Sequence, residues 1–117
     1  MRALNSFSDV YLHLGVSDMR FGVDRLALMI EEELGVKVFS GGIFVFVSRT
    51  RKKIKLLYWD RDGYAVWMKR LEAGVFRLDK GTSYDKITGV DLELLLSGVE
   101  LKRIKFAKHV EETLPYR

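Results

Sequence analysis

The 117-residue sequence contains no cysteine, one proline (Pro115) and two histidines that lie far apart, His13 and His109. The absence of cysteine excludes disulfides and thiolate chemistry and permits a reducing compartment. With so few histidines, a zinc site would have to be built largely from carboxylates, which is uncommon. No apolar run approaches the roughly 20 residues that span a bilayer, and the N-terminus has no apolar stretch typical of a signal peptide. We therefore expect a cytoplasmic protein that does not contact a membrane.

The overall composition is typical of an ordered globular protein, because 48% of the residues are apolar and 31% are charged. A chain of this length is expected to form a single domain, 1–117, and to bury roughly 65% of its extended surface. We place the core of this domain at about 9–99 and leave the tail, 100–117, without a structural assignment.

Two segments have the pattern of helices. Apolar residues recur at helical spacing over 19–34, with Ser17 or Asp18 available as the N-cap. A capping-box pattern that starts at Thr88 predicts a second helix over 88–97.

Alternating or β-branched stretches predict the strands. They lie at 10–14, 43–48, 53–59 and 64–71, with 75–78 as a further candidate. Short connections favour antiparallel pairing of consecutive strands. The sequence therefore predicts an α+β fold, an antiparallel β-meander of about four or five strands whose apolar face packs against one or two α-helices.

Positive charge is concentrated in the predicted hairpin, 49–70. Its eight Lys or Arg and two Asp give a local net charge of +6, whereas the other 95 residues sum to −2. Tyr58, Trp59, Tyr64 and Trp67 are interleaved with these cations. Cationic groups beside flat aromatic faces suit a polyanion that carries bases. We therefore predict a nucleic-acid interface. Its candidate residues are Arg49, Arg51, Lys52, Lys53, Lys55, Trp59, Arg61, Trp67, Lys69 and Arg70.

The turn sequence predicts how the two strands of this hairpin pair. Asp60-Arg61-Asp62-Gly63 suits a type I turn closed by glycine, which would place Asp60 opposite Tyr64. One face would then be an apolar core face of Ile54, Leu56, Tyr58, Tyr64, Val66 and Met68. The other face would carry Lys53, Lys55, Leu57, Trp59, Trp67 and Lys69.

On that outer face Lys55 and Lys69 would lie directly opposite each other, and a bound anion would relieve their repulsion. The alternative is that lysine stems cover apolar surface while their ammonium groups stay in water.

Catalytic and metal-binding patterns are weak in this sequence. It has no GxxxxGK[ST] phosphate-binding loop, and Asp60-x-Asp62-Gly63 lacks the later ligands of a calcium loop. His13 has the pattern of a half-buried strand residue. We expect no enzymatic activity, no cofactor and no metal site, with a magnesium-dependent nuclease using Asp60 and Asp62 as the minority alternative.

Several short blocks occur in an order and at a spacing that resemble a known protein family. They are Asp18–Arg20, Gly22–Ala27, Phe39–Gly41, Ile43–Phe46, Ile54–Asp60, Gly63-Tyr64, Lys69–Glu72, Phe76, Ile87-Thr88 and Leu95–Gly98. Over about Asp9 to Val99, the sequence is similar to the TnpB-type accessory protein of the insertion sequence family numbered sixty-six, which is unrelated to the RNA-guided nuclease of the same name. It departs from the family pattern at Val38, where proline is usual, at Leu78-Asp79, where Trp-Pro is usual, and after Val99.

The resemblance implies a bacterial mobile-element protein that assists transposition while a separate transposase performs the chemical step. It implies the transposase and a sister accessory protein as partners, and it brings no established catalytic residues. An oligomer is compatible with the sequence.

Two hypotheses about the molecular role remain open. In the first, the basic face of the hairpin contacts DNA phosphates and Trp59 or Trp67 stacks on bases. About six phosphate contacts would give a log–log salt slope near −5. In the second, the Trp-bearing face binds the transposase or the sister accessory protein without contacting DNA.

Overall fold

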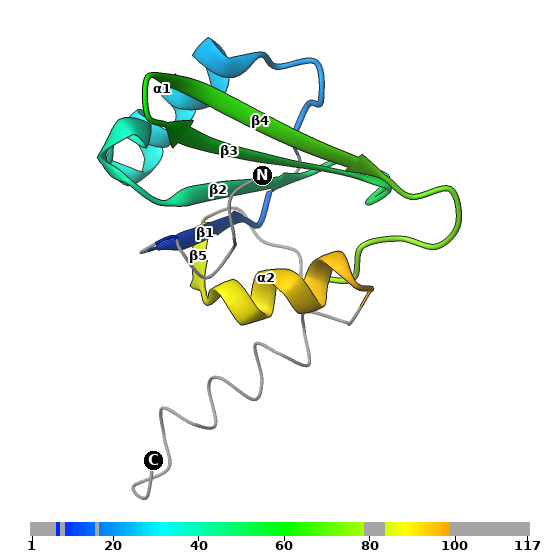
Figure 1. The fold of residues 1–117 in the computed structure, drawn as a ribbon. Coiled ribbons are helices and arrows are strands. Elements are labelled where there is room, and N and C mark those ends of the chain that lie inside the picture. The colour runs from blue at the N-terminus through cyan, green and yellow to red at the C-terminus, as the bar shows by residue number, and fades with distance from the viewer. Residues whose placement is uncertain (1–6, 8, 16, 79–83, 99–117) are drawn as a thin grey trace, which may run out of the picture.

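The computed structural model describes residues 7, 9–15, 17–78 and 84–98; His109 and the tail 100–117 lie outside the described residues. The elements are β1 (Val10–His13), α1 (Val23–Leu34), a short 3₁₀-helix (Val38–Ser40), β2 (Ile43–Val47), β3 (Lys53–Asp60), β4 (Gly63–Arg70), β5 (Tyr84–Ile87) and α2 (Gly89–Leu96). Figure 1 shows a sheet with α1 on one side and α2 on the other. No helix among the described residues combines the length and apolar character needed to cross a membrane.

The five strands form one sheet in the order β4-β3-β2-β1-β5. Three ladders are antiparallel, whereas β1 and β2 run parallel because α1 carries the chain back between them. The predicted α+β class is confirmed. The candidate strand at 75–78 is wrong, since the fifth strand is β5, and Phe76 is instead buried with its amide donating to the Arg51 carbonyl oxygen at 2.7 Å.

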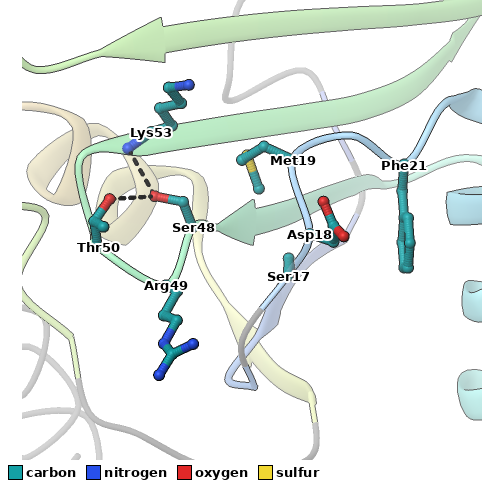
Figure 2. Close-up of a pocket in the computed structure, with 8 residues that line it drawn as sticks. All are labelled: Ser17, Asp18, Met19, Phe21, Ser48, Arg49, Thr50 and Lys53. Atoms are coloured by element: carbon teal, nitrogen blue, oxygen red, sulfur yellow. Dashed lines mark hydrogen bonds between the residues drawn. The ribbon is translucent and has the colours of Figure 1, made fainter.

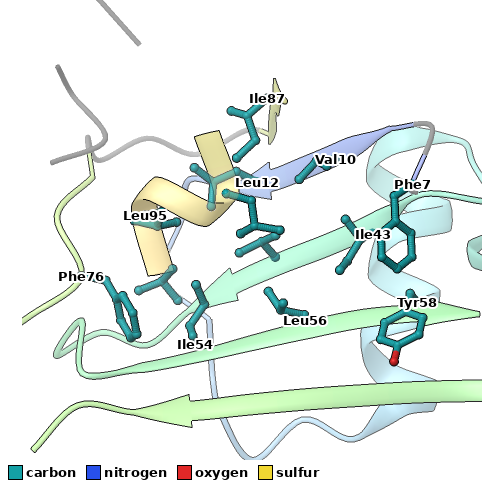
Figure 3. Packing of buried hydrophobic residues seen from close by; sticks show 13 residues of the cluster. Phe7, Val10, Leu12, Ile43, Ile54, Leu56, Tyr58, Phe76, Ile87 and Leu95 are labelled. Carbon is teal, nitrogen blue, oxygen red and sulfur yellow. The ribbon is translucent and has the colours of Figure 1, made fainter. Parts of the chain in front are cut away.

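The two helices cover opposite faces of the sheet, so the expectation that both cover one apolar face is wrong. On the α2 face, Leu92 and Leu95 pack with one set of strand residues, which includes Leu12 and Leu56 (Figure 3). On the α1 face, Leu26 and Ile30 pack with Phe44, Phe46 and Leu57. Strand β2 is buried on both faces. Each fully buried Leu, Ile or Phe contributes about 1.5–3 kcal/mol of hydrophobic free energy, which fixes the position of this central strand.

The helix ends follow local capping chemistry. Helix α1 begins at Val23, four residues later than predicted, because the Asp18 carboxylate accepts a hydrogen bond from the Arg20 amide (2.9 Å) in the preceding loop and does not cap the helix. Helix α2 begins as predicted. The Thr88 hydroxyl accepts from the Asp91 amide, and the Asp91 carboxylate accepts from the Thr88 amide, each at 3.0 Å.

The predicted register of the β3–β4 hairpin is wrong by one residue. Asp60 pairs with Gly63, so only Arg61 and Asp62 form the turn, and Arg61 adopts a positive φ of 54°. A one-residue shift moves every side chain of β4 to the other face of the sheet. The tighter turn thereby places Trp67 opposite Leu56 on the α2 face, where the indole packs against the buried cluster.

Candidate nucleic-acid interface

The corrected register separates the two tryptophans. Trp59 lies on the α1 face, where its indole N–H donates to the Arg61 carbonyl oxygen at 3.0 Å and its ring meets the ring of Tyr64 edge-on at 5.1 Å between centroids. Trp67 lies on the α2 face and packs against the apolar cluster there. The two indoles therefore do not share the single outer face that the sequence predicted.

The two central lysines are also on opposite faces, and the predicted Lys55–Lys69 pair does not form. The Lys55 ammonium group donates to the carbonyl oxygens of Met19 (2.7 Å) and Phe21 (3.0 Å), which holds the loop that precedes α1. The Lys69 ammonium group donates to the Leu96 carbonyl oxygen (3.2 Å) at the C-terminal end of α2, where a cation also complements the helix dipole. Both charges stabilise the fold.

Arg51 has a similar structural role in the β2–β3 connection. Its amide donates to the Ser48 carbonyl oxygen at 2.9 Å, and the residue adopts a positive φ of 62°. Its guanidinium group donates to the Leu78 carbonyl oxygen at 2.9 Å. Arg51 thus ties the segment after β4 to the turn that precedes β3.

Three other cations of this connection have unengaged charged groups. We call residues 49–53 the basic turn. Arg49 and Lys52 are exposed and Lys53 is half-exposed. Within the described residues, no ion pair or hydrogen bond engages the charged groups of these three side chains. They therefore project positive charge from one end of the sheet.

The last two cationic candidates, Arg70 and Arg61, lie in different places. Arg70 pairs with Lys53 across the hairpin, and its guanidinium group donates to the Glu72 carboxylate at 2.9 Å. Arg61 occupies the opposite end of the hairpin. At about 3.3 Å per residue, it lies more than 20 Å from the basic turn. The structure thus groups Arg70 with the basic turn and separates Arg61 from it.

A hollow of about 490 Å³ lies between the basic turn and the segment that precedes α1. It is lined by Ser17, Asp18, Met19, Phe21, Ser48, Arg49, Thr50 and Lys53. Figure 2 shows the side chains of Arg49 and Lys53 leaving the turn in different directions. Charges that point in different directions can contact separate phosphates of an extended polyanion. They are less suited to holding one small anion inside the hollow.

Asp18, which lines this hollow, forms an ion pair with Arg20 that was not predicted from the sequence. The Arg20 guanidinium group donates to both Asp18 carboxylate oxygens, at 3.0 Å from Nε to Oδ1 and 2.8 Å from Nη2 to Oδ2. These hydrogen bonds lower the pKa of Asp18 to about 2. The side chain of Arg20 is 89% exposed, but its charge is offset by the Asp18 carboxylate. The Asp-x-Arg spacing is the sequence feature that could have predicted this ion pair.

The α1 face of β4 is open to solvent, although its residues were predicted to face the core. Tyr64 is 44% exposed, Val66 42% and Met68 52%. Phe39, 58% exposed, approaches the Trp59 ring with 6.4 Å between centroids. Tyr64, Val66 and Met68 are exposed because α1 packs over β2 and β3 and does not reach β4. We call these three residues together with Phe39 the apolar row.

His13 belongs to a buried polar group between β1 and α1, and it is more buried than the half-buried strand residue predicted from the sequence. Its Nδ1 lies 3.1 Å from the Ser17 hydroxyl and 3.2 Å from the Gly15 carbonyl oxygen, and its Nε2 lies 3.7 Å from the Glu33 carboxylate. Burial lowers the pKa of His13, although Glu33 acts in the opposite direction. These contacts anchor the end of β1.

Asp60 and Asp62 lie at the tip of the hairpin, where the Asp62 amide donates to the Asp60 carbonyl oxygen at 2.6 Å. The described residues include no group of three or more His, Asp or Glu that could hold a metal ion.

Comparison with known proteins identifies relatives over most of the chain. A family profile described as "IS66 Orf2 like protein" matches residues 8–106. The chain is 32% identical over 106 residues to the uncharacterized protein y4hO of Sinorhizobium fredii (strain NBRC 101917 / NGR234), which covers 89% of this chain and 86% of that protein. It is 28% identical over 91 residues to the uncharacterized protein y4jC of the same organism, which covers 75% and 76%. No solved structure matches the chain.

Proposed function

Because the chain belongs to the IS66 Orf2-like family, as its sequence resemblance predicted, it is an accessory protein of transposition, and we propose that it binds DNA through the basic turn. The contact is made mainly to phosphate. Arg49, Lys52 and Lys53, whose charged groups are unengaged among the described residues, provide the charge. This proposal keeps the DNA-binding hypothesis and narrows the interface from the whole hairpin to one end of the sheet.

The observation that supports the proposal is the contrast between engaged and unengaged cations. Lys55, Lys69 and Arg51 donate to backbone carbonyl oxygens, and moving them to a phosphate would leave those carbonyls unpaired. Arg49 and Lys52 can bind a phosphate without breaking a contact among the described residues. Binding DNA at the basic turn therefore costs the fold nothing.

Base stacking has a small part in this arrangement. Trp67 packs into the apolar cluster, and Trp59 lies roughly 20 Å from Lys53 along β3. A contact built on phosphates alone predicts similar affinity for duplexes of different sequence, since phosphates carry no sequence information.

The test is a titration of a fluorescently labelled duplex, followed by anisotropy between about 50 and 200 mM NaCl. Three phosphate contacts predict a log–log slope of about −2.7. This value replaces the slope near −5 expected when the whole hairpin contacts DNA. The double variant Lys52→Ala/Lys53→Ala should flatten the slope by about 1.8.

Lys37→Ala is the matched control for charge removal. Lys37 is an exposed lysine that pairs with Glu31 and precedes β2, at the opposite end of that strand from the basic turn. Its replacement should leave the slope unchanged. A wild-type slope indistinguishable from zero would remove the DNA-binding proposal, and an unchanged slope in the double variant would exclude the basic turn.

The apolar row favours protein binding as a second candidate function. Exposed Tyr, Val, Met and Phe side chains beside Trp59 form the kind of surface on which binding energy concentrates. The transposase or a sister accessory protein is the partner that the family suggests. Co-purification with the transposase in high salt, after nuclease treatment, would support this function. If the two proteins separate under those conditions, their association depends on nucleic acid or charge and the apolar row is not the contact.

A further inference from the structure

Within the part of the chain that the structure describes, β4 is an edge strand whose outer side pairs with no other strand. It pairs with β3 over eight consecutive residues from Gly63 to Arg70, with no bulge and no proline. Long, regular and uncovered edges are the ones onto which another strand can add. The charges at the end of β4, Lys69 and Arg70, limit indiscriminate aggregation.

The hydrogen-bonding direction of each β4 residue follows from the ladder. The Leu71 amide donates to the Lys52 carbonyl oxygen at 2.7 Å, so these two residues face each other as a hydrogen-bonded pair. Such pairs alternate along an antiparallel ladder. Odd-numbered residues of β4 therefore direct their backbone groups toward β3, and even-numbered residues direct theirs to the open side. The same even-numbered residues, Tyr64, Val66 and Met68, carry the exposed apolar side chains.

We infer that β4 pairs with β4 of a second copy of this chain in antiparallel orientation, with Val66 opposite the partner's Val66. This register joins the two five-stranded sheets into one continuous sheet. It places Tyr64 opposite the partner's Met68, so the apolar row meets its own counterpart. It also places Asp62 opposite the partner's Arg70. Arg70 already donates to Glu72 of its own chain, so each Arg70 would lie between two carboxylates, and by symmetry this contact forms twice.

Side-chain size on the α2 face agrees with the same register. Trp67 would lie opposite the partner's Ala65, and Lys69 opposite the partner's Gly63. In each pair a large side chain meets a small one, which leaves room across the new strand boundary.

Neighbouring registers satisfy fewer of these conditions. A two-residue shift in one direction places Asp62 opposite the partner's Met68, which buries a carboxylate against an apolar side chain. A shift in the other direction places Tyr64 opposite the partner's Arg70 and Asp62 opposite the partner's Glu72. Charge complementarity therefore selects the register centred on Val66, and it favours a second copy as the occupant of this edge.

The first experiment measures mass by light scattering during size-exclusion chromatography, over a range of protein concentrations. At high concentration the full chain should approach twice its mass of 13.5 kDa. Val66→Lys should raise the dimer dissociation constant about tenfold or more, because two lysines would then face each other at the centre. Leu28→Lys is the matched control, since Leu28 is a similarly exposed apolar residue on α1, and it should leave the dimer intact.

The second experiment tests the register by exchanging charges. Arg70→Glu should weaken the dimer, because Asp62 would face a carboxylate, and Asp62→Lys combined with Arg70→Glu should restore it. Restoration identifies the facing pair, and failure to restore overturns this register.

Residue-resolved amide hydrogen exchange distinguishes strand pairing from side-chain contact alone. The amides of Tyr64, Val66 and Met68 should become more protected as protein concentration rises, while those of Ala65 and Trp67 are protected at every concentration. A monomeric mass at high concentration would overturn the inference. A Val66→Lys variant that stays dimeric would also overturn it. If that dimeric variant has lost binding to the transposase, the transposase and not a second copy occupies this edge.

Discussion

Strands β3 and β4 differ in how their two faces are used. Strand β3 is a covered strand, with Leu56 buried on the α2 face and Leu57 buried on the α1 face. Strand β4 is covered on the α2 face alone, where Trp67 packs, while Val66 and Met68 are exposed on the other. The two strands have similar apolar content. Their burial differs because α1 reaches β3 and stops short of β4, so the position of a helix decides which residues form the core.

The largest expected effect is a similar loss of stability on both faces of β3. Leu56→Ala and Leu57→Ala should each lower the free energy of unfolding by about 3 kcal/mol, since both side chains are fully buried and each truncation leaves a cavity. Urea unfolding monitored by tryptophan fluorescence measures both. If either substitution cost less than about 1 kcal/mol, one of the two faces would not be a packed layer.

On β4 the two faces should respond differently. Trp67→Ala should cost about 2 kcal/mol because it removes a half-buried indole from the α2 cluster, whereas Met68→Ala should change stability by less than about 0.5 kcal/mol. The comparison requires low protein concentration, so that self-association does not contribute to the measured stability. Equal losses in the two variants would contradict the register in which Trp67 faces α2.

The lysines give a smaller contrast between structural and surface charge. Lys55→Met should cost about 1–2 kcal/mol because two carbonyl oxygens lose their donor, and Lys69→Met should cost about 1 kcal/mol because one does. Lys52→Met is the control and should leave stability unchanged. The salt slope of DNA binding should behave in the opposite way, with Lys52→Met flattening it and Lys55→Met leaving it as in the wild type. A flatter slope in Lys55→Met would return the central lysine to the DNA interface.

The sequence predicts the elements of this fold better than their arrangement. The capping box at Thr88 and the β-branched run of β2 are local features, and both appear where the pattern places them. The parallel pairing of β1 with β2 depends on a crossover that no local pattern encodes. Strand β5 was missed because its four residues, Tyr84–Ile87, carry two charged side chains and lack apolar alternation.

The candidate site shows why a one-residue error matters for function. Local charge indicates the basic turn correctly as a cationic segment, because Arg49, Lys52 and Lys53 lie within five consecutive residues. The predicted outer face of lysines and indoles depended on the hairpin register. That register depends on how many residues form the turn. A two-residue turn needs a positive φ, which Arg61 adopts although a glycine stands two positions later. The turn predicted from the sequence was one residue longer and was closed by Gly63.

The smallest expected effect concerns pH and compares the buried His13 with the half-exposed Asp18. Burial lowers the pKa of His13 in the folded protein below its unfolded value of 6.5, so the unfolded chain takes up a proton first as the pH falls. Stability should therefore be complete above pH 6.5 and decline as the pH falls from 6.5 toward the lower folded value. Asp18, with its pKa lowered to about 2, adds a separate decline that begins only below about pH 4. Urea midpoints between about pH 7.5 and 5 should fall for the wild type and change less for His13→Gln, and equal slopes for the two proteins would show that His13 is not the titrating group.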